Sequence, residues 1–415
     1  MNMRKNILWN AVGNLIYMFC QWLITVLVTR LGTFEEAGIL SIAMSVSAIF
    51  QTLAMFGIRN FQVSDVEERY SDTNYVTFRV LTCTVAPIAC AVFSLIAGYR
   101  GRAILAILLF MLFRLAENFA DVFHGIAQKN GRLDIAGKSF AIKGCGALAA
   151  FLGGYLAVGE LCAAIGCMAA FSILSTLLYD MPAVSRLASY RLLVLRDTRI
   201  AQLAAETAPL CVYLLLNVAI MTLPKLILER SCGEELLGAY SSIFAPALLI
   251  QAVMGYVYTP FATSFGACRA AGDRRGFLLL FAKLTAVIAA LTAIMLPTAY
   301  FLGEPLLRLI FGEKIAPYVS YLIPILIAIA LTAFYSFLCM LATVLRRFLW
   351  LIGSSAVAVL LELALTGGWI NGAGVNATSY SLILAVSAAS LILFLDLLYA
   401  LFRKKERGEP NETNR

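Results

Sequence analysis

Residues 103–123 read AILAILLFMLFRLAENFADVF, and residues 124–138 continue as HGIAQKNGRLDIAGK. The first stretch is long and apolar enough to cross a bilayer as a helix, yet it contains Arg114, Glu117, Asn118 and Asp121. At about 100° per residue, Arg114, Glu117, Asp121 and the single histidine, His124, lie on one stripe of this helix.

An ionised side chain within the hydrocarbon core costs about 3 kcal/mol even on the lenient insertion scale. A helix with three such groups must therefore turn its polar stripe away from lipid, toward a wet cavity or a polar helix interface. Intramembrane ion pairs commonly mark a substrate or ion path, which makes Arg114, Glu117, Asn118 and Asp121 candidate path residues. The alternative is that Arg114 and Glu117, three residues apart, neutralise each other as a structural pair.

The composition predicts a membrane protein. Hydrophobic residues make up 61% of the chain and charged residues 13%, with a mean hydropathy of +0.86. An average soluble domain has roughly 45–50% apolar and 25% charged residues. The net charge of +8 resides in short loops, where it reports topology and not an affinity for nucleic acid.

Apolar runs of about 20 residues recur along the chain, each long enough to span a bilayer. We therefore predict an all-α integral membrane protein with about twelve transmembrane helices. The predicted spans are residues 7–29, 37–56, 78–98, 103–123, 139–158, 161–180, 201–228, 238–260, 277–302, 317–344, 348–366 and 377–402.

The basic residues predict how these spans are oriented. When alternate loops are assigned to one side, that side holds 24 of the 32 Lys and Arg residues, the other side holds 7, and Arg114 lies inside a span. By the positive-inside rule both termini lie in the cytoplasm of a multi-pass protein of the cell (inner) membrane.

A weak internal echo suggests two halves. Residues 57–78 and 255–277 both run from a glycine, through a polar loop, to a phenylalanine that opens the next span. We predict two six-helix lobes, residues 1–200 and 201–402, followed by a cytoplasmic tail, residues 403–415. The alternative is that any two cytoplasmic loops look alike.

Two further ionisable residues lie beside prolines in the seventh span. Glu206 precedes Pro209, Lys225 follows Pro224, and proline frees backbone groups and permits bending. Both are candidates for a cavity. Because both lie near span ends, their long side chains could instead reach the membrane interface.

The motifs of nucleotide and hydrolytic chemistry are missing. The sequence has no Walker motif, no Rossmann glycine pattern, no His-rich metal cluster and no serine elbow. The ten cysteines lack ligand spacing and are interpreted as reduced packing residues. We expect no metal, no cofactor and no enzymatic activity.

Several segments resemble a known family. LVTRLGTFEEAGILSIAMS (27–45), GIRNFQVSDV (57–66), RLAENFADVFHGIAQKNGRLDIAGKSF (114–140) and the glycine-rich turn NGAGV (371–375) are similar to bacterial polysaccharide and O-antigen flippases of the Wzx type. These belong to the MATE-like multidrug/oligosaccharidyl-lipid/polysaccharide flippase superfamily. The resemblance extends through most of the chain, although its motifs are diffuse.

The resemblance implies a MATE-like fold and a function in polysaccharide or lipopolysaccharide biosynthesis. A lipid-linked oligosaccharide on polyprenyl pyrophosphate would cross to the outer leaflet by alternating access, with a proton or sodium ion as possible coupling partner. The family's cavity arginines correspond to Arg30, Arg59 and Arg114. Arginine suits this task because its planar fork matches phosphate oxygens.

Two rival functions stay open. An ion-coupled MATE-type exporter of drugs or metabolites could use Glu117 with Asp121 to exchange a cation or proton. An integral-membrane glycosyl- or acyltransferase could use either carboxylate as a base, but no donor-binding motif is visible.

Overall fold

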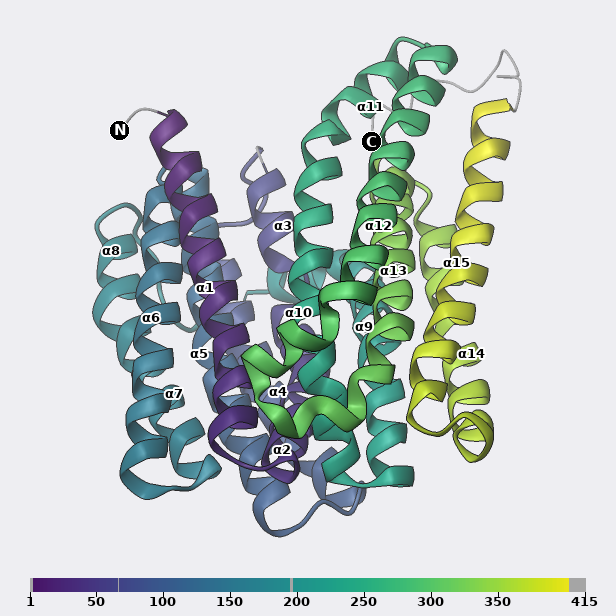
Figure 1. Cartoon of the computed structure of the whole chain (residues 1–415). Helices are drawn as coiled ribbons and strands as arrows, with labels where there is room; N and C mark the ends of the chain where they lie inside the picture. Colours follow the sequence, from purple (N-terminus) through teal and green to yellow (C-terminus); the bar gives the residue numbers. More distant parts are fainter. Residues whose placement is uncertain (1–2, 66, 195–196, 403–415) are drawn as a thin grey trace.

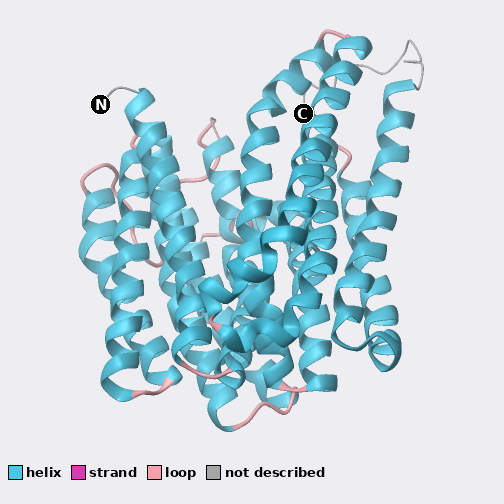
Figure 2. Cartoon of the chain, in the orientation of Figure 1, coloured by secondary structure: helices cyan, strands magenta, loops and turns pink. Residues whose placement is uncertain are grey.

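A computed structural model describes residues 3–65, 67–194 and 197–402. This part of the chain consists of helices joined by short loops and contains no strand (Figure 2). The prediction of an all-α protein is confirmed.

The helices fall into two groups along the chain. The N-terminal group contains α1 (Met3–Leu31), α2 (Phe34–Met55), α3 (Ile58–Ser64), α4 (Asp72–Ile96), α5 (Gly101–Lys129), α6 (Leu133–Val158), α7 (Leu161–Ser175), the π-helix η1 (Thr176–Asp180) and α8 (Met181–Ser185). The C-terminal group contains α9 (Arg199–Cys232), α10 (Glu234–Tyr258), η2 (Thr259–Phe261), α11 (Ala262–Ala270), α12 (Arg274–Phe311), η3 (Glu313–Tyr321), α13 (Leu322–Val344), α14 (Phe348–Ala373), η4 (Gly374–Asn376) and α15 (Ala377–Phe402).

The described residues include ten helical segments that are long and apolar enough to cross a membrane. Two of these, residues 199–270 and 348–402, each contain two long helices separated by a turn, at Gly233 and at η4. Counted this way, the helices agree with the twelve predicted spans. The chain is a multi-pass membrane protein, and the predicted tail, residues 403–415, lies outside the described residues.

Within the N-terminal group, glycines bring the backbones of α1 and α6 into close contact. A Cβ atom on Gly13 would lie 1.9 Å from the carbonyl oxygen of Gly137, and one on Gly137 would lie 2.2 Å from that of Trp9. No larger residue fits at either position without moving a helix. This packing holds α1 closely against α6.

The two groups meet where α2 crosses α10, and the contact is reciprocal. A Cβ atom on Gly38 would lie 1.9 Å from the carbonyl oxygen of Glu234, and one on Gly238 would lie 1.8 Å from that of Phe34. Each glycine thus packs on a residue four positions before the other. Next to this crossing the hydroxyls of Ser41 and Ser241 lie 2.6 Å apart, and those of Thr29 and Ser242 lie 2.7 Å apart.

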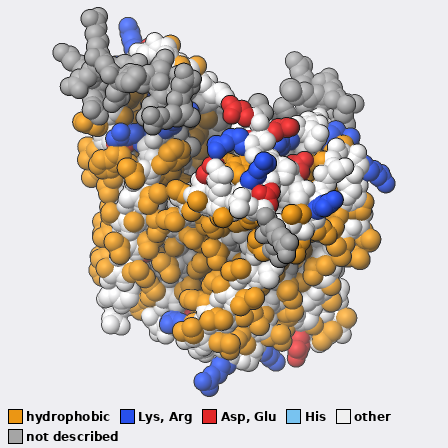
Figure 3. Space-filling view, turned by 180° about the vertical axis from the view of Figure 1, so that it is seen from behind, with side chains coloured by type: hydrophobic (Ala, Val, Ile, Leu, Met, Phe, Trp, Pro, Cys, Tyr) orange, Lys and Arg blue, Asp and Glu red, His pale blue; other side chains and the backbone are white. Residues whose placement is uncertain are grey.

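The groups converge at one end of the molecule and diverge at the other (Figure 1). The convergent end carries the α1–α2 and α9–α10 turns, and the divergent end carries the N-terminus, α3, α8 and α11. Seen from behind, charged side chains gather near the divergent end above a broad apolar belt (Figure 3). In the predicted topology the divergent end faces the cytoplasm.

Candidate functional site

Helix α5 turns its polar stripe into the protein, as predicted. Asp121 is 7% exposed and His124 is 2% exposed, whereas Leu105 and Leu112 are 48% and 44% exposed. The stripe does not form one continuous network. Its members instead make three separate sets of contacts with neighbouring helices.

The first set joins α5 to α1. Arg114 Nη1 donates to Glu117 Oε2 at 2.8 Å, and the hydroxyl of Tyr17 donates to the other oxygen of Glu117. The guanidinium also lies 5.0 Å and 5.3 Å from the ring centroids of Phe110 and Phe113. The charge of Arg114 is therefore neutralised locally, although both members of the pair keep some exposure.

The second set lies between α3, α4 and α5, and a break in the helix places it there. Phe56 and Gly57 both adopt left-handed backbone conformations, with φ of 51° and 68°, which ends α2 and starts α3 in a new direction. Gly57 is also close to α9, since a Cβ atom on it would lie 2.7 Å from Leu210 Cδ2. The redirected α3 carries Arg59 toward α5.

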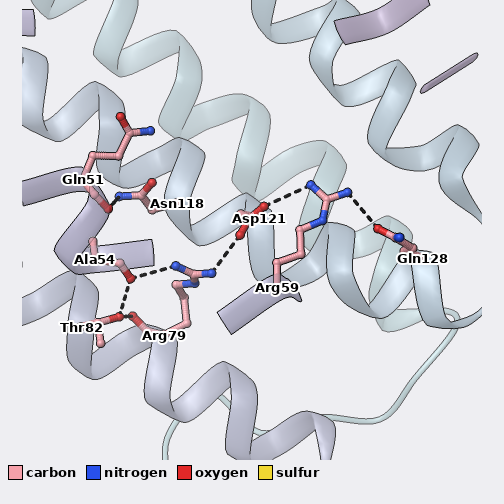
Figure 4. Close-up of polar contacts among 8 residues, drawn as sticks. All are labelled: Gln51, Ala54, Arg59, Arg79, Thr82, Asn118, Asp121 and Gln128. Carbon is pink, nitrogen blue, oxygen red and sulfur yellow. Dashed lines mark hydrogen bonds and ion pairs between the residues drawn. The ribbon is translucent and has the colours of Figure 1, made fainter. Parts of the chain in front are cut away.

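Arg59 contacts two residues of α5 that lie two helical turns apart. Its Nη1 donates to Asp121 Oδ1 at 3.1 Å, and its Nη2 donates to Gln128 Oε1 at 3.2 Å (Figure 4). Both ends of the guanidinium fork are thus occupied by oxygen atoms. The Arg59 side chain is 23% exposed, so it sits at the edge of the packed helices.

Arg79 of α4 binds the same carboxylate from the interior. Its Nη2 donates to Asp121 Oδ2 at 2.9 Å, and its Nη1 donates to the carbonyl oxygen of Ala54 at 2.8 Å (Figure 4). That carbonyl belongs to the last turn of α2, where carbonyl groups lack helical partners, and Thr82 also donates to it. The Arg79 side chain is completely buried.

One carboxylate therefore serves two arginines, which leaves the Arg59–Asp121–Arg79 cluster with a formal charge of +1. Asp121 keeps a buried partner even if Arg59 turns away. On the side of Asp121 that faces away from Arg59, Asn118 Nδ2 donates to the carbonyl oxygen of Gln51 at 3.5 Å (Figure 4). The Arg59 guanidinium can therefore bind an anion while the buried Asp121 carboxylate stays paired with Arg79.

The third set is fully buried within the N-terminal group. His124 Nε2 lies 3.2 Å from Asp180 Oδ1, and Lys143 Nζ lies 2.7 Å from Asp180 Oδ2. Asp180 is the last residue of the π-helix η1, a type of helical turn that is frequent at functional sites. These contacts join α5, α6 and η1 into one unit.

The loop after α3 is organised by Asp65. Its carboxylate accepts hydrogen bonds from the backbone N–H groups of Arg69 (3.0 Å) and Tyr70 (3.1 Å) and from the Tyr75 hydroxyl (2.8 Å). Burial raises the pKa of Asp65, but these three donors outweigh it and hold the pKa below 3.8. These hydrogen bonds tie the end of α3 to residues just before and at the start of α4.

The remaining predicted residues lie apart from these clusters. Arg30 is exposed at the convergent end, where it contacts the end of α12. Glu206 accepts from Arg69 at 3.1 Å at the divergent end, and Lys225 lies 3.9 Å from the ring centroid of Phe244. Arg30, Arg59 and Arg114 therefore do not form a single cationic cluster.

Sequence reasoning missed Arg79, Lys143 and Asp180. The first two were counted among the cytoplasmic basic residues, but their side chains are buried between helices. When Arg79 and Lys143 are left out, the predicted cytoplasmic side still holds 22 basic residues and the other side 7. A signal was present, because each of the three residues falls within a predicted apolar span, close to its end.

Among the described residues, no group of three or more His, Cys, Asp or Glu side chains is placed to hold a metal ion. The polar clusters are built instead from arginine–carboxylate and lysine–carboxylate pairs inside an apolar helical bundle. This arrangement defines a class of fold, the polytopic all-α membrane proteins with two groups of helices that meet at one end.

Solved structures identify the particular fold within that class. The chain is similar to an inward-facing multidrug resistance MATE family transporter of the MOP superfamily (TM-score 0.69, 13% identity, 97% of this chain and 100% of that one). It is similar to the lipid II flippase MurJ in an inward closed conformation (TM-score 0.70, 12% identity, 95% and 89%). An outward-facing MATE transporter of the MOP superfamily gives a TM-score of 0.60 at 12% identity, over 97% and 96%. The chain has the MATE-like fold that was predicted.

The sequence comparisons are weaker. No protein-family model matches the chain. The capsular polysaccharide biosynthesis protein CapF of Staphylococcus aureus is 26% identical over 328 residues, which cover 75% of this chain and 78% of CapF.

Proposed function

We propose that this protein is a flippase that moves a lipid-linked oligosaccharide, carried on polyprenyl pyrophosphate, from the cytoplasmic to the outer leaflet. The observation that carries the proposal is the net positive Arg59–Asp121–Arg79 cluster, with Arg59 at its exposed edge. The similarity to the capsular polysaccharide biosynthesis protein CapF and the fold shared with the lipid II flippase MurJ support the same class of substrate.

The chemistry of the cluster suits a pyrophosphate. Two oxygen atoms, one from Asp121 and one from Gln128, already occupy the guanidinium fork of Arg59. Two phosphate oxygens can take their places, because a guanidinium binds phosphate through parallel N–H donors. Asp121 then keeps its contact with Arg79, so the exchange leaves no carboxylate unpaired.

The arrangement of the helices suits loading from the cytoplasm. The groups converge at the end with the α1–α2 turn and diverge at the end that the basic residues assign to the cytoplasm (Figure 1). We propose that residues 1–200 and 201–402 rock as two lobes in the cell membrane, with both termini in the cytoplasm. A proton or sodium gradient is the proposed driving force.

The two rival functions fit the site less well. An exporter of cationic drugs needs carboxylates that are free to exchange a cation, but Glu117 is held by Arg114 and Tyr17, and Asp121 by two arginines. The same contacts keep both carboxylates from acting as the base of a transferase. Glu206, near the start of α9 at the divergent end, and Lys225, nearer the convergent end of the same helix, remain proposed path residues.

Reconstituted vesicles test the proposal. The purified protein should translocate a polyprenyl-pyrophosphate-linked oligosaccharide, and an imposed proton or sodium gradient should accelerate it. A cationic dye should not be translocated under the same conditions. Transport of the dye without transport of the glycolipid would establish the exporter instead.

A further inference from the structure

Three basic side chains bridge the two groups of helices at the convergent end, and they share one geometry. Arg30 Nη1 of α1 donates to the carbonyl oxygens of Leu309 and Ile310 at 2.7 Å and 3.1 Å. Both carbonyls belong to the last turn of α12, which ends at Phe311. A cation of the N-terminal group thus binds the C-terminal end of a helix in the C-terminal group.

The same contact occurs twice in the reverse direction. Lys314 Nζ, in η3, donates to the carbonyl oxygen of Gly32 at 2.7 Å, directly after the end of α1. Arg230 Nη2, in the last turn of α9, donates to the carbonyl oxygen of Ala97 at 3.1 Å, directly after the end of α4. Both cations belong to the C-terminal group and both helix ends to the N-terminal group.

The ends of helices make natural partners for these cations. The last four carbonyl groups of a helix have no partner within it, and the aligned peptide dipoles place a partial negative charge there. Each of the three contacts therefore gives a hydrogen-bond donor to an unpaired carbonyl group. It also places a positive charge at the negative end of a helix dipole. Every one of them must break if the two groups separate at this end.

We propose that Arg30, Arg230 and Lys314 form a reciprocal latch that holds the exit side of the transport path closed, and that substrate release requires all three cations to leave their helix ends. The inference rests on the proposed alternating access, but it assigns these residues to the control of opening and not to substrate binding. Arg30 accordingly has a different role from Arg59.

Arg308 provides an internal control. It lies at the same end and is a partly exposed arginine, but it pairs with Glu304 at 2.5 Å and Glu313 at 2.9 Å, both within its own group of helices. Removing its charge changes the basic character of this end as much as removing that of Arg30. It breaks no contact between the groups.

The opening can be followed with a cysteine at Ser241, which is 8% exposed where α10 meets α2. We would replace the ten native cysteines, confirm unchanged abundance and melting temperature, and measure labelling of Ser241→Cys by a membrane-impermeant maleimide in nanodiscs. The variants are Arg30→Met, Arg230→Met, Lys314→Met, all three together, and Arg308→Met as the control. Arg30→Lys, which keeps a cation, serves as the conservative variant.

Each single latch variant should raise the labelling rate about two- to fivefold, the range expected for a cation at a helix end, and the triple variant on the order of tenfold or more. Arg308→Met and Arg30→Lys should label at the parent rate. Equal labelling of the triple variant and Arg308→Met would overturn the proposal. Because labelling needs no substrate, this result is independent of whether the protein carries a glycolipid.

Discussion

Replacing Asp121 with asparagine should destabilise the protein by about 3–5 kcal/mol, because it leaves Arg79 as a buried charge without its carboxylate. The two arginines on Asp121 differ in burial, since the Arg79 side chain is 0% exposed and that of Arg59 is 23% exposed. Arg59 can turn toward water when it loses Asp121, which limits its share of the loss to about 0–1 kcal/mol. Nearly all of the cost therefore belongs to Arg79.

This difference gives a test by double substitution. Asp121→Asn combined with Arg79→Met should recover most of the lost stability, whereas Asp121→Asn combined with Arg59→Met should recover almost none. Unfolding of the purified protein in detergent, by heat or by denaturant, measures both values. If the Arg59 combination recovers as much as the Arg79 combination, the assignment of the stability cost to the buried Arg79 and not to the partly exposed Arg59 is wrong.

Three more predictions follow from the other clusters. Arg114→Ala should destabilise the protein and lower its abundance in the membrane, because it leaves the Glu117 carboxylate unpaired. Arg114→Ala combined with Glu117→Ala should restore the abundance. If the double variant also exports glycan at the wild-type rate, the pair has a purely structural role. Asp180→Asn should cost about 3–5 kcal/mol because Lys143 is buried, and adding Lys143→Met should recover most of that loss in the same unfolding assay. Asp65→Asn should destabilise by about 1–3 kcal/mol near neutral pH through its weakened hydrogen bonds. Because folding lowers the pKa of Asp65, its contribution is present above pH 3.8 and is lost as the pH falls through the lower folded-state value, so wild type and variant should converge in stability on acidification.

Periodicity was sufficient to predict the orientation of α5, because a helix in lipid has only one way to hide a polar stripe. It could not predict the partners of that stripe. Arg59 and Asp121 are 62 positions apart, and Arg30 contacts a carbonyl 279 positions away. Such pairs depend on how helices pack, and the hydrophobic pattern of one helix carries no information about its neighbours.

The residues that were missed show a second limit. Arg79 and Lys143 lie near the ends of predicted spans, where a basic residue usually reports topology. In the structure Arg79 binds a carbonyl group in the last turn of α2, and Lys143 pairs with Asp180, the last residue of a π-helix. Neither a helix end with free carbonyls nor a π-helix has a sequence signature clear enough to predict these contacts.

Flipping by Arg59 variants tests the proposed function most directly. Arg59→Lys keeps the positive charge but loses the bidentate fork, and Arg59→Met loses both, while Asp121 retains Arg79 in each variant. Arg102→Met is the matched control, because Arg102 is an exposed arginine that pairs with the exposed Glu160, away from the cluster. In vesicles with equal amounts of folded protein, we expect both Arg59 variants to flip the glycolipid at least about tenfold more slowly than Arg102→Met, since a lost charged hydrogen bond is worth about 1.5–3 kcal/mol. Flipping by Arg59→Met at the rate of Arg102→Met would contradict the assignment of Arg59 as the phosphate-binding residue.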